Sequence, residues 1–190
     1  MMITKRSFLT ALALGVLALN LQSAHAAKPK SEDELIASLA DKDPKKVAES
    51  MLQLEKQYPT STRMQAEIKK YLTDPRDIVR RKAGRVLGAL HAEVSDADLK
   101  HIAAMLKGTT KEEVMDALKS LRGLKSQSVI PEIVALLQNS EPNIVRDACR
   151  TLGEIGTKAN VPSLEPLLKS ADPKVQKDAQ DAIFKLNSRS

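Results

Sequence analysis

The segment NIVRDACRTLGEIG (143–156) places the chain's only cysteine among charged residues. Arg146, Asp147 and Arg150 surround Cys149, and a cysteine beside basic groups can be an activated nucleophile. In a helix, however, successive residues turn by about 100°, which puts Asp147 and Cys149 about 160° apart and directs both arginines toward solvent. The four side chains therefore diverge, and we expect them to form no catalytic site.

No other group of residues predicts catalysis or metal binding. His91 and His101 lie on either side of Glu93, Asp96 and Asp98, in a spacing that matches no recognised set of metal ligands. Neither a glycine-rich phosphate loop nor a paired serine, histidine and aspartate can be identified. We expect a protein that is not an enzyme and that holds no metal or cofactor.

The chain repeats itself with a period of about 31 residues. Residues 128–145 match residues 159–175 at that shift, so that Pro131 corresponds to Pro162 and Pro142 to Pro173. Within each repeat, apolar residues recur on one face of an α-helix. The equivalent positions are Val79, Glu113, Ile144 and Val175; Ala83, Ala117, Ala148 and Ala179; Leu87, Leu121, Leu152 and Ile183; and Leu90, Leu124, Ile155 and Leu186.

Each repeat is predicted to be a pair of helices. One pair cannot bury its apolar face alone, so consecutive pairs must stack into an all-α superhelix, or solenoid, with capping helices at both ends. Aspartates directly before prolines (Asp43, Asp74 and Asp172) predict helix starts, and SEDE (31–34) is a capping box. The predicted segments are 27–43 with the N-terminal capping helix, a repeat domain 44–190 with helix pairs at 44–73, 74–107, 108–139 and 140–170, and a closing helix at 171–187.

Three of these segments carry a family resemblance. They are DPRDIVRRKAGRVLGAL (74–90), EPNIVRDACRTLGEIG (141–156) and DPKVQKDAQDAIFKL (172–186). Their proline, Val/Ile–Arg step, central alanine and Leu-Gly pair resemble the first helix of short HEAT-like repeats, including the type found in phycobilin lyases. The resemblance implies that a row of aspartates, here Asp116, Asp147 and Asp178, joins neighbouring repeats. It implies little about activity, because solenoid families share architecture more than function.

The repeat register leaves two interpretations of Cys149. Its position holds Gly84, Leu118 and Gln180 in the other units, which favours a half-buried thiol that packs as a small apolar side chain. The alternative is a reactive or partner-bonding thiol, because an unpaired cysteine in a secreted protein can be oxidised or crosslinked.

A partner-binding surface is predicted on the second helices, which usually line the concave face of a HEAT-like superhelix. Their solvent-facing positions form two rows, Lys69, Ala103, Val134 and Glu165, and Lys70, Ala104, Ala135 and Pro166. A shallow groove with an apolar middle, a basic start and an acidic end suits a peptide or a helix from another protein. Alternatively, small residues lie there only because curvature crowds that side.

Basic residues on the first helices offer another surface. They are Arg81, Arg85, Lys119, Arg146, Arg150, Lys177 and Lys185. Regular cations of this kind can contact phosphates or an anionic membrane, but Glu154 and Asp181 interrupt them, which favours an ordinary solvated face. Nucleic-acid binding is further disfavoured because aromatic stacking residues are scarce. Peripheral contact with an anionic membrane stays an alternative.

The first residues predict export. Lys5 and Arg6 precede an apolar run from Phe8 to Leu21, and Ala24 and Ala26 provide the small residues of a cleavage site. We expect residues 1–26 to be a signal peptide that is cleaved after Ala26, and the mature protein to reside in the periplasm. Cleavage would lower the formal charge from +6 to +4.

The predicted function is that of an exported, non-catalytic scaffold or adaptor that binds a protein or peptide partner. The alternative is a chromophore- or cofactor-attachment enzyme like the bilin lyases, whose repeats these resemble; predicted export argues against it. The sequence leaves the identity of the partner and the oligomeric state open.

Overall fold

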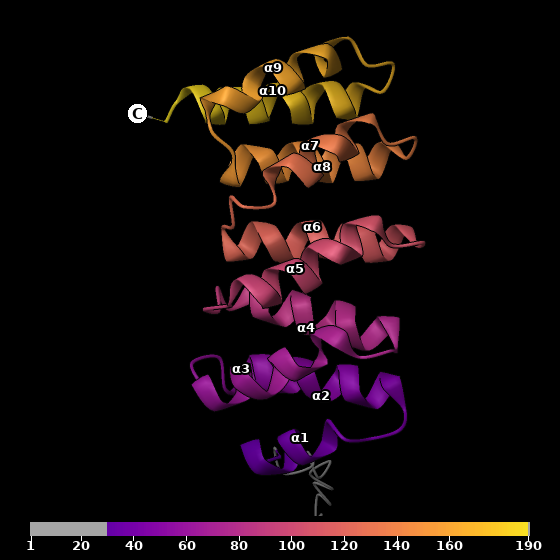
Figure 1. The fold of residues 1–190 in the computed structure, drawn as a ribbon, viewed down its shortest axis with the longest axis vertical. Coiled ribbons are helices and arrows are strands. Elements are labelled where there is room, and N and C mark those ends of the chain that lie inside the picture. Colours follow the sequence, from indigo (N-terminus) through magenta and orange to yellow (C-terminus); the bar gives the residue numbers. More distant parts are fainter. Residues whose placement is uncertain (1–29, 190) are drawn as a thin grey trace, which may run out of the picture. The chain divides into compact units, whose positions relative to one another are not determined.

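The computed structural model describes residues 30–189, in which all regular elements are helices (Figure 1). The predicted signal peptide and its cleavage site lie outside the described residues. Residues 31–189 form one unit. Across the described part of the chain, no helix has the length and apolar character needed to cross a membrane.

Long first helices alternate with short second helices along the chain. The first helices are α2 (Pro44–Gln57), α4 (Asp77–Ala89), α6 (Lys111–Leu124) and α8 (Pro142–Ile155). The second helices are α3 (Thr62–Lys69), α5 (Asp96–Ala104), α7 (Ile130–Ala135) and α9 (Val161–Leu164), and each continues into a 3₁₀ turn. With α1 (Glu32–Ser38) before the first pair and α10 (Pro173–Asn187) after the last, the predicted superhelix of four helix pairs and two capping helices is confirmed.

Three helices begin where the sequence predicts capping. The Ser31 hydroxyl accepts a hydrogen bond from the Glu34 backbone N–H, and the Glu34 carboxylate accepts one from the Ser31 N–H, which completes the capping box of α1. The carboxylates of Asp43 and Asp172 each accept from the backbone N–H two residues later, at 2.9 and 2.8 Å, and so cap α2 and α10.

The start of α4 differs from the prediction that Asp74 caps it. This helix begins at Asp77, although the Asp74 carboxylate accepts from the Arg76 backbone N–H at 2.9 Å, just as those of Asp43 and Asp172 accept from the N–H two residues on. The same carboxylate also accepts from the Arg76 guanidinium, at 2.7 and 2.8 Å. The hydrogen bonds from the Arg76 side chain lower the pKa of Asp74. Since the same guanidinium donates to the Asp41 carbonyl oxygen at 3.0 Å, this turn connects α4 to the segment before α2.

The repeat register defines one continuous core. Four alanines share a register position on the first helices and α10, and all of them are fully buried: Ala83, Ala117, Ala148 and Ala179. The leucines one turn further on, Leu87, Leu121 and Leu152, are also fully buried. The small and large rows therefore alternate along each helix, and the first helices pack on one another as well as on their own second helices.

Glycines set the distance between α4 and α6. A Cβ atom on Gly123 would lie 2.2 Å from the Gly88 carbonyl oxygen, and a Cβ atom on Gly88 would lie 2.7 Å from the Cα atom of Ser120. Both neighbours are backbone atoms, which cannot move aside without moving a helix. The two helices thus approach to direct backbone contact, which only glycine permits at these positions.

We expect Gly123→Ala to lower the free energy of unfolding by roughly 1–3 kcal/mol, because the added methyl group overpacks this contact. Urea denaturation followed by circular dichroism measures the change. Gly84→Ala is the matched control: its Cβ atom would meet side-chain atoms of Met105 and Ser120 at 3.2 Å, and alanine favours a helix interior by about 1 kcal/mol. An equal loss in both variants would contradict the close-approach argument.

Candidate binding groove

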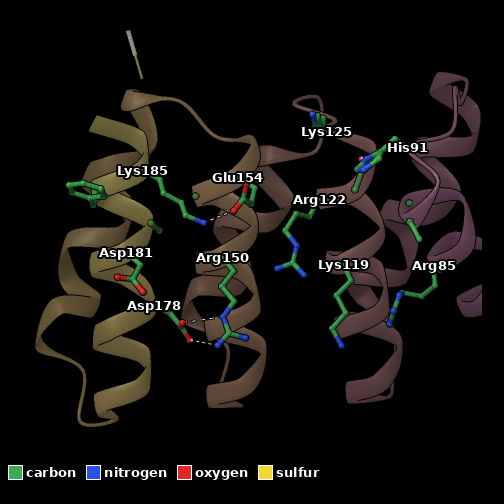
Figure 2. A pocket seen from close by; sticks show the side chains of 16 residues that line it. Arg85, His91, Lys119, Arg122, Lys125, Arg150, Glu154, Asp178, Asp181 and Lys185 are labelled. Atoms are coloured by element: carbon green, nitrogen blue, oxygen red, sulfur yellow. Dashed lines mark hydrogen bonds and ion pairs between the residues drawn. The ribbon is translucent and has the colours of Figure 1, made fainter. Parts of the chain in front are cut away.

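A groove crosses the layer of first helices and the closing helix (Figure 2). Its volume is about 800 Å³, and it is lined by residues of α4, α6, α8 and α10. Gly88, Gly123 and Gly153 are among the lining residues, at positions where neighbouring helices approach to backbone distance. We call this feature the first-helix groove.

The first-helix groove is mainly basic. Its cationic residues are Arg85, Lys119, Arg122, Lys125, Arg150 and Lys185, and its carboxylates are Glu154, Asp178 and Asp181. Positive and negative charges are unevenly placed in the groove. The charged lining residues of α6 are all cations, whereas α10 contributes two of the three carboxylates. Phe184 also lines the groove on α10, and this side chain is 72% exposed.

Arginine pairs on one helix bind an aspartate on the next. The ion pairs are Arg81–Asp116 (3.2 Å) and Arg85–Asp116 (3.1 Å) between α4 and α6, and Arg146–Asp178 (2.7 Å) and Arg150–Asp178 (3.0 Å) between α8 and α10. The structure therefore shows the aspartate ladder at Asp116 and Asp178. It also corrects the prediction that Arg146 and Arg150 simply point to solvent: both reach along the layer to the following helix.

Asp147 is the exception in the ladder. It is 3% exposed, and its Oδ1 accepts only from Arg150 of its own helix, at 3.2 Å. Its Oδ2 is buried without a hydrogen-bond partner. The reason lies in α6, where Met115 occupies the register position of Arg81 and Arg146. No arginine pair therefore crosses from α6 to α8.

Cys149 is more deeply buried than the helix pattern predicts. Its side chain is fully buried rather than half-buried, since α8 packs between α6 and α10. Burial raises the pKa of the thiol to about 12, so the nucleophilic thiolate is scarce near neutral pH. This geometry favours the interpretation of Cys149 as a small apolar side chain.

His91 anchors one end of the groove. It has a φ of 49°, in the left-handed region, at the end of α4. Its Nδ1–H donates to the Gly123 carbonyl oxygen at 2.6 Å, so the ring connects α4 to α6 rather than facing a ligand set. Within residues 30–189, no three histidine, cysteine or carboxylate side chains converge as they would around a metal ion.

The predicted partner-binding surface lies on the layer of second helices, and not on the layer of first helices that forms the groove. Lys70, Ala104, Ala135 and Glu165 are exposed, whereas Lys69, Ala103 and Val134 are half-buried. Ala103 and Val134 pack against the core, so they give that surface less apolar area than predicted. Its role in binding stays a prediction.

The groove residues Arg122 and Lys125 were missed by sequence reasoning, although Arg122 replaces the glycine found at this register position in α4 and α8.

The architecture defines the class first: an all-α solenoid of stacked helix pairs. Residues 111–183 match the family model for HEAT repeats. This match shows HEAT repeats over that range, and the described helices before it continue the same fold of stacked pairs. No curated protein matches the chain.

Solved structures share the fold at low sequence identity. The complex of CpcE and CpcF of phycocyanin lyase from Nostoc sp. PCC7120 has a TM-score of 0.71 and 21% identity, with 84% of this chain and 66% of that chain covered, just under two thirds of the lyase chain. The designed armadillo repeat protein YIII(Dq)4CqI has a TM-score of 0.54 and 17% identity over 81% of both chains. Computationally designed armadillo repeat proteins for modular peptide recognition give 0.54 and 16%, again over 81% of both chains.

Replacing Asp178 is expected to cost more stability than replacing Asp147. Asp178→Asn removes the charge from a carboxylate that binds two arginines of another helix, and we expect a loss of about 2 kcal/mol. Asp147→Asn keeps one acceptor for Arg150 and replaces an oxygen that has no partner, so we expect less than about 1 kcal/mol. Urea denaturation compares the two, and a larger loss for Asp147→Asn would contradict the broken ladder.

Cys149 is expected to resist thiol reagents in the folded protein. Because the side chain is buried and its pKa is raised to about 12, labelling by a maleimide or a disulfide reagent should proceed only through unfolding. Mass spectrometry after labelling with and without urea measures this. Rapid stoichiometric labelling of the native protein would restore the reactive-thiol interpretation.

Proposed function

We propose that the protein is an exported, non-catalytic scaffold or adaptor that binds a segment of another protein in the first-helix groove. The observation that carries this proposal is the groove itself, a feature of about 800 Å³ that crosses four consecutive helices of a HEAT-like solenoid. Its size lies within the range of roughly 300–1,000 Å³ that is typical of binding pockets.

The groove has the properties of a peptide-binding surface. Its backbone is held by helix–helix packing and by interhelical ion pairs, so little order must be gained on binding. Polar side chains line the groove and can orient a ligand by hydrogen bonds and ion pairs. The fold similarity to armadillo proteins designed for modular peptide recognition supports the same class of partner.

Export is included in this proposal, and its support is the sequence pattern at the N-terminus alone. The basic start, the apolar run and the small residues before Ala27 match a cleavable signal peptide. A periplasmic scaffold without a disulfide must be held together by packing, which agrees with the fully buried core rows.

A lyase-like role in attaching a chromophore or cofactor is the second candidate. The similarity to the phycocyanin lyase complex favours it, and the CpcE–CpcF assembly shows this fold in contact with another protein chain. The described groove residues include no thiol that could carry a group, because Cys149 is buried and does not line the groove. We therefore place partner binding first.

Capture from the exported fraction tests this function. The tagged protein, purified after expression with its own N-terminus, should begin at Ala27, and a lysine-directed crosslinker should join a captured partner to Lys119, Lys125 or Lys185. Crosslinks confined to Lys69 and Lys70 would instead place binding on the second helices. A coloured adduct would support the lyase candidate. An intact Met1 would overturn export, and no partner above an unrelated exported bait would overturn the scaffold function.

A further inference from the structure

The three junctions between consecutive helices of the groove are not equivalent. α4 packs more extensively on α6, and α8 on α10, than α6 packs on α8. The two tight junctions share a sequence pattern: an arginine, a second arginine four residues later, and a glycine three residues after that. The residues are Arg81, Arg85 and Gly88 in α4, and Arg146, Arg150 and Gly153 in α8.

Each part of this pattern has a structural role. The arginines bind the aspartate of the next helix, at 3.1–3.2 Å from α4 and at 2.7–3.0 Å from α8. The glycines let the next helix approach, since a Cβ atom on Gly153 would lie 3.0 Å from the Cα atom of Ala182, and Gly88 makes an even closer contact. The pattern therefore holds two consecutive helices close together in two ways, by ion pairs and by the absence of a side chain at the glycine.

α6 breaks the pattern at all three positions. It carries Met115, Lys119 and Arg122 where the other two helices have arginine, arginine and glycine. Arg122 cannot permit the close approach that glycine permits, and Asp147 across the junction keeps a buried, unpartnered oxygen. The α6–α8 junction is consequently the more open one, and its α6 side is left with cations that the ladder does not use.

Three cations at this junction form no close contact with a carboxylate, and Arg122 has only a longer-range charge interaction with Glu154. Among residues 30–189, the side chains of Lys119, Arg122 and Lys125 form no hydrogen bond or ion pair, and all three line the groove. Figure 2 shows the Arg122 side chain extending between α6 and α8, with Lys119 on the same helix and Lys125 at its end. The cations on the other helices, Arg85, Arg150 and Lys185, are each paired with a carboxylate.

We propose that Lys119, Arg122 and Lys125 form an anion-recognition site for an acidic segment of a protein partner, with its carboxylates at the α6–α8 junction. This inference rests on the proposed function and specifies the chemistry of the partner. A guanidinium and two ammonium groups supply donors that match carboxylates, and the half-buried positions of Lys119 and Arg122 strengthen such contacts relative to a fully exposed surface.

The charges on the far side of the groove favour a peptide over a polyanion. Asp181 lies on α10, across from α6, and would disfavour a nucleic-acid backbone or an anionic membrane that spans the groove, whereas Asp178 and Glu154 are already paired with cations of the groove. Phe184 on that side offers an apolar contact, with 72% of its surface exposed. A peptide with an acidic segment followed by an apolar residue therefore fits the groove, with its carboxylates at the α6 cations and its apolar side chain at Phe184 of α10.

Fluorescence anisotropy with a defined peptide tests this site. The probe is a short fluorescent peptide of glutamate and serine that ends in phenylalanine, and the controls replace its glutamates by glutamine or lysine. We expect the acidic probe alone to bind, with an affinity that falls as salt is added. Arg122→Gln and Lys119→Gln should each weaken binding about tenfold, the loss of roughly one charge-assisted contact.

Lys107→Gln is the matched control variant. It removes one positive charge from an exposed position on the second-helix layer and should leave binding unchanged. Circular dichroism and a melting curve establish that each variant is folded. Equal binding by wild type and both groove variants, or equal weakening by Lys107→Gln, would overturn the site.

Other outcomes separate this inference from the proposed function. Tighter binding of an oligonucleotide or of phosphatidylglycerol vesicles, lost in Arg122→Gln, would replace the acidic peptide by a polyanion. If the acidic probe does not bind but a captured partner still crosslinks to Lys119 or Lys125, the partner chemistry is wrong and the scaffold function stands. If no partner is captured either, both are wrong.

Discussion

The structure depends on how closely consecutive first helices approach one another. Glycine at one face of α4 and α8 brings the next helix to backbone distance, and an arginine pair one turn earlier binds that helix through a single aspartate. Shape and charge act together here, because an arginine can reach the aspartate of the next helix only when the two helices lie close together. The core rows, the burial of Cys149 and the position of the groove all follow from this spacing.

Helix periodicity and the repeat shift were sufficient to predict the fold. Steps of three and four residues identify a helix face, and agreement at a fixed shift identifies stacked pairs, because neither signal requires knowledge of distant contacts. Asp43 and Asp172 were correctly predicted as caps for the same local reason. Asp74 was not, since α4 begins at Asp77. The Asp74 carboxylate also binds the Arg76 guanidinium, which reaches the Asp41 carbonyl oxygen before α2, a distant contact that the local pattern does not show.

The candidate site was less predictable because its location depends on the relative spacing of two layers. A single helix places Arg150 toward solvent and Cys149 at an edge, but packing of α6 and α10 on either side of α8 buries the thiol and brings Asp178 within reach of the arginine. The exceptional residue, Arg122, was visible as a break in the register. What the register could not show is that the break leaves an open, cationic junction in the middle of a groove.

The buried, unpartnered oxygen of Asp147 has a consequence for how the stack behaves as a cooperative unit. In a solenoid, each repeat is stabilised chiefly by its immediate neighbours, so total stability is a chain of nearest-neighbour couplings. Among the helices of the groove, α6 and α8 are the least extensively packed neighbours, so this junction separates the tightly packed pair α4 and α6 from the tightly packed pair α8 and α10. A ligand that bridges this junction would therefore act on the whole array, because it would couple the unfolding of one pair to that of the other.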